Sequence, residues 1–383
     1  LFRSHCNEIT VFNFLRHMTR EWIEPLCVAL VLAIIIKRTF MEIYVIPTSS
    51  MEPTLHGAGN YPEDGGDKVL VDKTAYWNST PERWDVVVFL APPPAVRTGV
   101  TKYFIKRLIG KPGEDLRIRN GDIYINGKIA RRPPEVLNTQ LYNVFDSKDL
   151  RWTDHWNGSG EWSADNNTIA FSSEGHGTLK FSKEINDHIE SDGDNPCDSI
   201  VGDIRVSGTL KFLTRKGRFG IRITENNSVY AAELDADSNV LRIRENTEIV
   251  KQKAYTPPSD TALSVRFENI DGRLRFSVQK TTLEWEDPDG LRWESTRNSG
   301  VMISADDTDL LFKDCRLDRD IYYTIVNSGS YSVPDNGYFV LGDNSSESKD
   351  SRFWNEVPKE NVIGRAIYVV WPIRIWPFSG KPP

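Results

Sequence analysis

The sequence predicts a mainly β protein with an N-terminal transmembrane helix, a β-rich core and an antiparallel β-sandwich inserted into that core. Three observations support this fold class. One apolar stretch lies near the N-terminus, strand-like runs with frequent Gly and Pro follow it, and a middle region differs in composition from both flanks. The chain has 383 residues, enough for two or three domains.

The composition limits the classes of function. The net charge is −7, from 47 basic and 54 acidic residues. This balance argues against nucleic acid as a partner, because nucleic-acid binders concentrate basic residues on one face. Hydrophobic residues make up 39% of the chain, so it can bury a core. Four cysteines are too few for a disulfide scaffold. No cofactor and no metal are expected.

An apolar segment opens the chain. Residues 22–36 are almost uncharged after Glu24. Because a bilayer core needs about 20 helical residues, residues 20–45 are predicted to form a transmembrane anchor, with Lys37 and Arg38 reaching an interface. Residues 1–19 would then be a cytoplasmic segment, although the positive-inside rule favours this orientation only slightly. A cleaved signal peptide and a buried soluble helix are the alternatives.

Two β-rich blocks, residues 46–149 and 321–383, are predicted to form the core. Alternating apolar residues around Asn120-Gly121 predict a hairpin at 116–127. Other expected strands lie at 68–76, 84–92, 101–110, 337–344 and 364–373.

The region between these blocks, residues 150–320, is rich in Asp, Asn, Ser and Gly. Its apolar residues alternate with polar ones, as at Leu274, Phe276 and Val278, which is typical of half-buried antiparallel strands. Expected strands lie at 178–182, 209–215, 219–224, 228–234, 240–244, 264–270 and 273–279. The region is therefore predicted to be an inserted β-sandwich.

Two short motifs suggest chemistry. IPTSSMEPTL (46–55) follows the apolar segment, and KYFIKRLIGKPGED (102–115) places Lys106 inside a predicted strand. Taken alone, the first is a common loop sequence and the second fits a lysine whose charged end reaches water. Together, and in order with KVLVDKTAY, WDVVVF and GDNSSESKDSRFW, they are far more specific.

This ordered set resembles the bacterial type I signal peptidases, which are membrane-bound Ser/Lys-dyad proteases that remove signal peptides from exported proteins. The resemblance covers residues ~20–130 and ~320–372 and implies the signal-peptidase β-fold for the core. It implies Ser50 as the nucleophile and Lys106 as the general base. It also implies that the Thr48 hydroxyl joins the Ser50 N–H in the oxyanion hole.

Further roles are implied by the same resemblance. Ser348 would orient the lysine, two ion pairs would support the site, and a weakly assigned substrate pocket would accept small side chains. The ion pairs are Arg107–Asp343 and Asp350–Arg352, and the pocket residues are Ile46, Pro47 and Phe104. The sequence departs from the commoner GDNRxNSxDSR form of the family at Ser345 and Ser346.

The residue types agree with this chemistry. Serine is a poor nucleophile until a base takes its proton, and a lysine is a base only when neutral. An ordinary lysine pKa is about 10.4, so the amine needs burial among apolar neighbours. Phe104, Ile105 and Leu108 could supply them, together with Met51 and Leu55. His56 is expected to be a turn residue, because a Ser/His scheme would leave Lys106 unexplained.

The resemblance implies partners and a location. The partners would be signal-peptide-bearing preproteins, cut after small-x-small sites, and a lipid bilayer. Ser50 lies 14 residues after Ile36, which would keep the nucleophile near the bilayer surface. The chain would be a single-pass protein of the cell (inner) membrane with its catalytic domain on the extracytoplasmic side.

The inserted region loosely resembles concanavalin-like or laminin-G-like jelly rolls. It could be a spacer, a module for an envelope glycan or protein ligand, or an aid to substrate recognition. Cys197 and Cys315 could pair outside the cell. Two aspartate groups, Asp306, Asp307 and Asp309 and also Asp192, Asp194 and Asp198, fit either Ca²⁺ or solvated turns.

Two other functions stay open beside the peptidase. One is a self-cleaving repressor with the same dyad, which the apolar segment and the lack of a basic DNA-binding helix disfavour. The other is a membrane-anchored binding protein with an inactive protease core, which the intact Ser50, Lys106, Ser348 and Asp350 disfavour.

Overall fold

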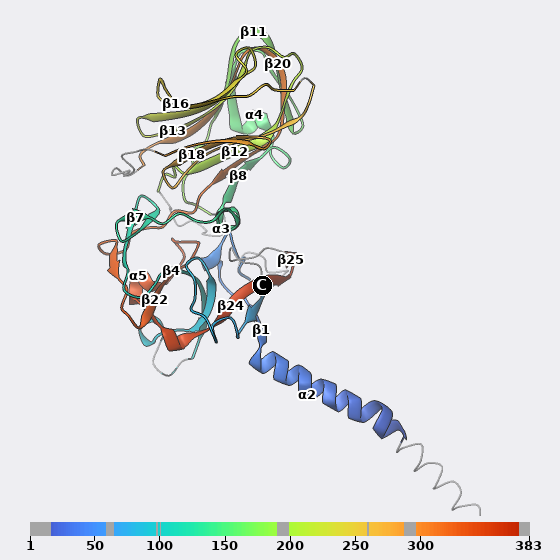
Figure 1. Ribbon diagram of the computed structural model, residues 1–383, viewed down its shortest axis with the longest axis vertical. Helices are drawn as coiled ribbons and strands as arrows, with labels where there is room; N and C mark the ends of the chain where they lie inside the picture. Colours follow the sequence, from blue (N-terminus) through green and yellow to red (C-terminus); the bar gives the residue numbers. More distant parts are fainter. Residues whose placement is uncertain are drawn as a thin grey trace, which may run out of the picture.

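The computed structural model describes residues 17–58, 65–96, 99, 101–189, 199–258, 260–286 and 296–374. Figure 1 shows two β lobes, with one helix projecting from the lower lobe. The lower lobe, here called the core, contains an eight-stranded and a four-stranded sheet. The upper lobe, here called the insert, spans residues 142–319 and contains one thirteen-stranded sheet. The prediction of a mainly β chain is confirmed.

The N-terminal helix is shorter than the predicted anchor of 20–45. A π-helical turn, η1 (Thr19–Ile23), continues into α2 (Glu24–Thr39), and Met41–Val45 then forms strand β1. The prediction of helix through residue 45 was wrong because the sequence MEIYV, with its β-branched and aromatic residues, suits a strand that pairs with β2 (Lys68–Asp72). Among the described residues, no helix combines the length and the apolar character needed to cross a bilayer.

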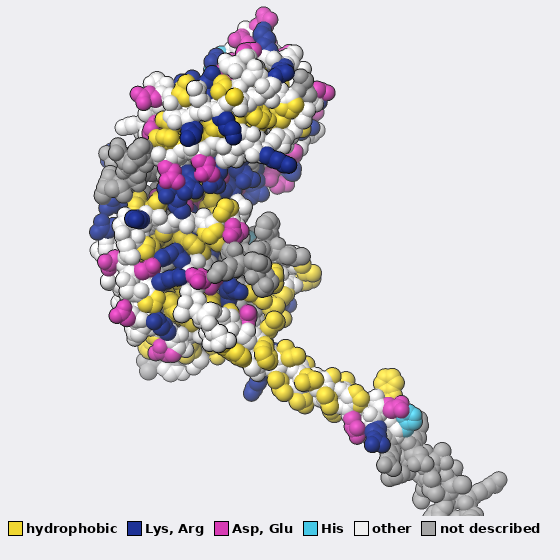
Figure 2. Space-filling model, in the orientation of Figure 1, with side chains coloured by type: hydrophobic (Ala, Val, Ile, Leu, Met, Phe, Trp, Pro, Cys, Tyr) yellow, Lys and Arg dark blue, Asp and Glu magenta, His cyan; other side chains and the backbone are white. Residues whose placement is uncertain are grey.

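Helix α2 makes no buried contacts. All of its residues are exposed, and its apolar side chains form a continuous surface in Figure 2. Leu26 is 70% exposed and Ile36 is 52% exposed. The apolar surface continues on β1, where Ile43 and Val45 are each more than half exposed.

The larger core sheet brings distant parts of the chain together. Its order is β1-β2-β24-β3-β4-β22-β23, and β25 pairs with β24. The strands after β2 are β3 (Val86–Leu90), β4 (Tyr103–Gly110), β22 (Gly337–Leu341), β23 (Val357–Pro358), β24 (Val362–Trp371) and β25 (Ile373–Arg374). Strand β4 therefore lies between β3 and β22, so the two sequence blocks on either side of the insert form one sheet.

The smaller core sheet contains the predicted hairpin. Its order is β21 (Ser330–Ser332), β5 (Asp115–Arg119), β6 (Asp122–Ile125) and β7 (Lys128–Ile129). Arg119 pairs with Asp122 around Asn120 and Gly121, whose φ angles of +50° and +85° give the expected two-residue turn.

The insert is a curled sheet around an apolar core. Its central order is β16-β15-β14-β13-β20-β12-β17-β18-β19, and β16 and β19 contact each other. The strands are β8 (Tyr142–Asp146), β9 (Trp156–Ser159), β10 (Trp162–Asp165), β11 (Thr168–Phe181), β12 (Ile204–Phe212), β13 (Arg218–Glu225), β14 (Ser228–Asp235), β15 (Val240–Glu245), β16 (Glu248–Ala254), β17 (Leu263–Ile270), β18 (Arg273–Val278), β19 (Thr281–Glu286) and β20 (Ser299–Arg319). Strand β8 lies within the range expected for the core, yet it pairs with β20 of the insert.

The two lobes meet through charged side chains. Helix α3 (Pro134–Gln140) leads into the insert, and the chain returns to the core after β20. Arg132 pairs with Asp320 and with Asp271, at 2.9 Å for the latter. Figure 2 shows basic and acidic side chains gathered between the lobes. Other short helices in the described ranges are η2 (Ser49–Met51), η3 (Pro93–Ala95), α4 (Trp152–His155), α5 (Ser351–Trp354) and η5 (Lys359–Asn361).

Candidate active site

Ser50 sits in a short helical turn against the edge of the core. Turn η2 follows β1, and Ser50 is 7% exposed while the next residue, Met51, is fully buried. The backbone N–H of Asn344 donates to the Ser50 carbonyl at 3.2 Å. A Cβ on Gly342 would lie 2.4 Å from that carbonyl oxygen, so glycine is required for this close approach.

Lys106 reaches Ser50 from strand β4. Its Nζ lies 2.5 Å from Ser50 Oγ, although 56 residues separate the two in the chain. Lys106 is 5% exposed. Because side chains alternate along a strand, Lys106 shares a face with Phe104 and Leu108, while Arg107 points to the other face.

The surroundings favour the neutral form of this amine. Burial lowers the pKa of Lys106 from 10.5 to about 8, although the Asp350 and Asp343 carboxylates act in the opposite direction. Arg352 contributes to the lowering. The lysine therefore loses its proton near pH 8, well below the range of an exposed lysine.

Thr48 lies beside the same hydroxyl. Its Oγ1 donates to Ser50 Oγ at 3.3 Å. A carbonyl carbon attacked by Ser50 Oγ would carry its oxygen close to this hydroxyl. The Thr48 side chain is therefore near enough to donate a hydrogen bond to that carbonyl oxygen.

Arg107 and Asp343 form a buried ion pair directly behind Lys106. Arg107 Nη2 donates to Asp343 Oδ2 at 2.6 Å, and Arg107 Nε donates to Oδ1 at 2.9 Å. Both side chains have no exposed surface. Thr54 Oγ1 also donates to Asp343, at 2.5 Å. These donors fix the carboxylate beside β4, since each of its oxygens receives at least one hydrogen bond.

Asp350 and Arg352 form the second implied pair. Asp350 caps α5 by accepting from the Arg352 backbone N–H, and its two oxygens accept from Arg352 Nε and Nη2, each at 2.8 Å. Its Oδ2 also accepts from the Gly342 N–H at 3.0 Å. Arg352 further donates to Ser345 Oγ at 2.5 Å and to the Ser348 carbonyl at 3.2 Å. This one guanidinium therefore bonds three residues of the loop after β22, Ser345, Ser348 and Asp350.

Ser348 is the residue expected to orient Lys106. It is 3% exposed, and its hydroxyl has no hydrogen-bond partner among the described residues. It does lie close to the site, because a Cβ on Gly342 would meet both the Ser348 hydroxyl and the Ser50 carbonyl.

The three residues expected to line the substrate pocket differ in their exposure. Ile46 is 3% exposed and packs in the cluster of Met51, so it offers little surface to a substrate. Pro47 is exposed, and Phe104 is half-buried against Phe89. His56, expected in a turn, lies with its Nδ1 3.8 Å from Glu52 Oε1.

Sequence reasoning missed several residues of the site. Thr54 bonds Asp343, and Thr324 accepts from Arg352 Nη1 at 2.6 Å. Gln140, from the segment leading into the insert, donates to Asp343 at 3.0 Å. Thr54 was within reach of prediction because it belongs to the motif of Ser50. The other two carry no local signal, since only the fold brings them to this site.

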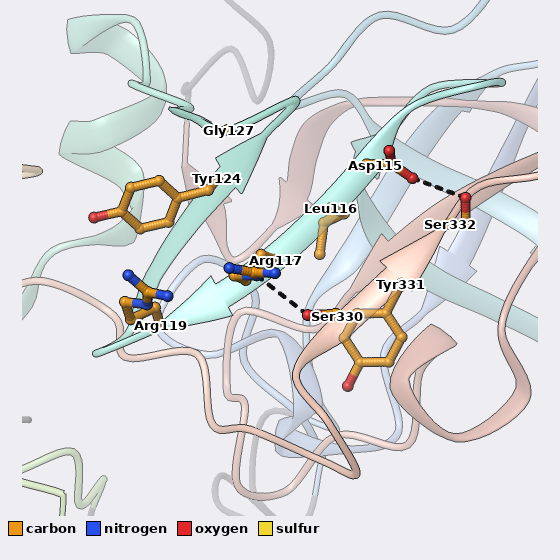
Figure 3. A pocket seen from close by; sticks show the side chains of 9 residues that line it. All are labelled: Asp115, Leu116, Arg117, Arg119, Tyr124, Gly127, Ser330, Tyr331 and Ser332. Atoms are coloured by element: carbon orange, nitrogen blue, oxygen red, sulfur yellow. Dashed lines mark hydrogen bonds between the residues drawn. The ribbon is translucent and has the colours of Figure 1, made fainter. Parts of the chain in front are cut away.

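A separate pocket of about 560 Å³ lies on the smaller core sheet. Figure 3 shows Arg117, Arg119 and Tyr124 on this face, with Arg117 donating to Ser330. No predicted site residue lines this pocket.

In the described part of the chain, one cluster of acidic side chains has the spacing of a metal site. The carboxylates of Asp122, Asp203 and Asp271 lie within 4.8 Å of one another. Asp306, from the first aspartate group, instead contacts His176, and Asp309 accepts from Ser172 at 2.5 Å.

Other predictions for the insert fall outside the described residues. The second aspartate group, Asp192, Asp194 and Asp198, lies there, as does Cys197. The expected partner, Cys315, is buried in the apolar core of the insert.

Comparison with known families identifies the core. A family model described as "Signal peptidase, peptidase S26" matches residues 19–159 and 303–371, which is more than half of the chain. The unmatched residues between these ranges belong to the insert.

Curated relatives are similar to about a third of the chain. A probable signal peptidase I-2 of Synechocystis sp. is 36% identical over 150 residues, covering 35% of this chain and 65% of the relative. Signal peptidase I of Bacillus amyloliquefaciens is 34% identical over 113 residues, covering 30% of this chain and 51% of the relative. The chain therefore spans about half to two thirds of the length of these relatives.

Solved structures are similar only remotely. The carbohydrate-binding module CBM66 from Bacillus subtilis has a TM-score of 0.32 at 10% identity, covering 42% of this chain and 93% of the module. A Bacillus subtilis protein of unknown function with a galectin-like fold has a TM-score of 0.35 at 10% identity, covering 46% of this chain and 97% of that protein.

Proposed function

The chain belongs to the signal peptidase family, peptidase S26, and from this premise we propose that it is a serine endopeptidase that removes N-terminal signal peptides from exported preproteins. Ser50 acts as the nucleophile and Lys106 as the general base. The observation that carries this proposal is the 2.5 Å approach of Lys106 Nζ to Ser50 Oγ between two side chains that are only 5% and 7% exposed.

The proposed reaction begins with a neutral Lys106. The Ser50 hydroxyl donates to the lone pair of Nζ, gives up its proton, and Oγ attacks the scissile carbonyl carbon. The resulting oxyanion accepts from the Ser50 N–H and the Thr48 hydroxyl. The protonated lysine then gives its proton to the leaving amine, and an ester on Ser50 remains. Water, deprotonated by the same lysine, hydrolyses that ester and releases the second product.

Two buried ion pairs hold Ser50 and Lys106 in this geometry. Arg352 and Asp350 fix the loop that approaches the Ser50 carbonyl, and Asp343 with Arg107 fixes the strand next to Lys106. We propose that Ser348, whose buried hydroxyl has no partner among the described residues, orients the ammonium form of the lysine during the reaction.

The apolar surface of α2 and β1 suggests where the enzyme works. Exposed apolar side chains on this scale mark a contact with lipid or protein. We propose that this surface attaches the chain to a lipid bilayer on the extracytoplasmic side. Val45 and Ser50 are five residues apart, a reach of at most about 17 Å, so the nucleophile stays close to the lipid. Preproteins with small-x-small cleavage sites would be the substrates there.

A cleavage assay tests the proposal. The purified full chain, in detergent or vesicles, should cut a preprotein after an Ala-x-Ala site. Ser50→Ala and Lys106→Met should each reduce kcat by about 10³-fold or more. Ser49→Ala is the matched control, since Ser49 is the neighbouring serine of the same turn, and it should keep nearly full activity. Equal losses in the Ser49 and Ser50 variants would contradict the assignment.

The pH profile gives a second test. A base with a pKa of about 8 is neutral above that pH and protonated below it. The kcat/KM should therefore rise about tenfold per pH unit up to pH 8 and level off above it. A profile that is flat between pH 6 and pH 9 would contradict Lys106 as the base.

A further inference from the structure

The segment that leads into the insert ends against the ion pair behind Lys106. Gln140 is the last residue of α3, and β8 of the insert begins two residues later. Gln140 is fully buried, and its Nε2 donates to Asp343 Oδ1 at 3.0 Å. The same Nε2 lies 3.4 Å from the hydroxyl of Tyr323, four residues after the insert ends. Both connections of the insert thus meet at one amide group.

The orientation of this amide is decided by chemistry. The Nε2 group faces a carboxylate, which only accepts hydrogen bonds, so the reversed amide would place two oxygens against each other. The other end, Gln140 Oε1, is buried and has no partner among the described residues. An unpaired buried oxygen lowers stability and so offsets part of what the hydrogen bond to the carboxylate contributes. What the amide adds to the site is a neutral donor fixed on Asp343 Oδ1.

Asp343 passes the effect of Gln140 to the catalytic residues by two routes. Through Arg107 it holds β4 at the residue next to Lys106. Through its neighbour Gly342 it holds the backbone that touches the Ser50 carbonyl. A shift of Asp343 would therefore move both partners of the 2.5 Å contact.

We propose that Gln140 is a positioning residue of the peptidase, through which the segment leading into the insert holds Asp343 in place behind the Ser50–Lys106 pair. This inference rests on the proposed function for its kinetic consequence. The positioning itself can also be measured without any cleavage.

The charges around the site determine the direction of the expected effect. Lys106 faces Asp343 after β22, Asp350 and Arg352 at α5, and lies next to Arg107 on β4. Asp343 also has the hydroxyls of Thr54 and Tyr323 near it, and Arg132 acts on Arg107 from the junction. The Gln140 N–H partly offsets the negative charge of Asp343. Without it, the carboxylate would favour the protonated lysine more strongly and raise the pKa of Lys106.

Two variants and one control test this. Gln140→Met keeps the size but removes the donor, and Gln140→Glu keeps the shape but adds an acidic group beside Asp343. Asn138→Ala is the matched control, since Asn138 is on the same helix and accepts from Arg205 of the insert at 2.7 Å, without contacting Asp343. The full chain is used throughout, and its folding is checked by circular dichroism and thermal unfolding.

In the Gln140 variants, we expect the acid limb of the pH profile, where kcat/KM rises with pH, to shift to higher pH. We expect about half a unit for Gln140→Met, which is about threefold less activity at pH 7, and a larger move for Gln140→Glu. Asn138→Ala should leave the limb in place. An unchanged limb in both Gln140 variants, or an equal move in Asn138→Ala, would overturn the proposal.

A second measurement separates this proposal from the peptidase activity. In a Ser50→Ala background, the rate of Lys106 acetylation by acetic anhydride is followed against pH by mass spectrometry. The midpoint should rise in Gln140→Glu and stay in place in Asn138→Ala. If the chain cleaves no preprotein but this midpoint moves, the proposed function fails and the positioning role of Gln140 stands. If cleavage depends on Ser50 but the Gln140 variants move neither the acid limb of kcat/KM nor the midpoint of Lys106 acetylation, only the role of Gln140 fails.

Discussion

The core and the insert place their charged groups differently. In the core, Arg107 and Asp343 form an ion pair with no exposed surface, directly behind the serine and the lysine. In the insert, a typical pair such as Arg273 and Glu286 joins β18 to β19 on the outside, with side chains 29% and 47% exposed. The interior of the insert instead holds a large cluster of apolar side chains.

The difference shows which region gives up stability for chemistry. A buried ion pair loses the solvation of both charges and is seldom more stable than an apolar pair of the same size. The core retains such pairs where they fix the site. The insert obtains its stability mainly from apolar burial. Apart from the buried pair Arg205–Glu268, pairs such as Arg273–Glu286 lie near water, where each contributes little.

The largest expected effect is in the core. Asp343→Ala would leave the Arg107 guanidinium buried without its carboxylate, which typically costs about 3–5 kcal/mol of unfolding free energy. Chemical denaturation measures this loss, and cleavage activity should disappear with it. Asp335→Ala, an exposed aspartate of the same region, is the control. A loss below about 1 kcal/mol would remove the contrast between the lobes.

The junction should respond to pH. Burial raises the pKa of Asp320 to about 7, although Arg132 opposes this rise. Because the folded carboxyl holds its proton more tightly than the unfolded one, stability is lost as pH rises from about 4 through 7. Arg132→Met should destabilise the chain by about 3 kcal/mol at pH 8 and by less at pH 5. Arg131→Met removes the partly exposed ion pair of Arg131 with Glu286, whose atoms are 3.4 Å apart. It should cause neither the loss of stability nor its dependence on pH. Equal losses at both pH values would contradict this.

Replacing the proposed base should stabilise the fold. The folded pKa of Lys106, about 8, is below the ordinary 10.5, so at pH 7 the folded chain carries a charge in an unfavourable place. Lys106→Met should raise the unfolding free energy at pH 7 on the order of 2 kcal/mol. This gain should shrink between pH 8 and pH 10.5, as the native lysine becomes neutral. Lys102→Met, at an exposed lysine, is the control. A destabilised Lys106→Met chain would contradict the argument.

The smallest effect is expected on the surface of the insert. Arg273→Ala should change the unfolding free energy by less than about 1 kcal/mol, because water already solvates both partners. Cleavage should be unchanged. A loss above 2 kcal/mol would show that the insert, like the core, depends on its ion pairs.

Local patterns sufficed for much of the fold. The alternation around Asn120-Gly121 determined the hairpin of β5 and β6, because side chains on a strand face opposite ways and this dipeptide adopts the required turn. The resemblance of the ordered motifs to type I signal peptidases also brought Ser50 and Lys106 forward as candidates before any distance was known. Both inferences rest on residues close together in the sequence or on short motifs.

Other features were decided only by tertiary contacts. Residues 41–45 are apolar enough for a helix or a strand, and pairing with β2 decides for the strand. Gln140 has no local pattern, and its role depends on a contact with Asp343, 203 residues later. Composition and periodicity report which faces a segment can bury, whereas the partner on the other side of that face is known only once the chain has folded.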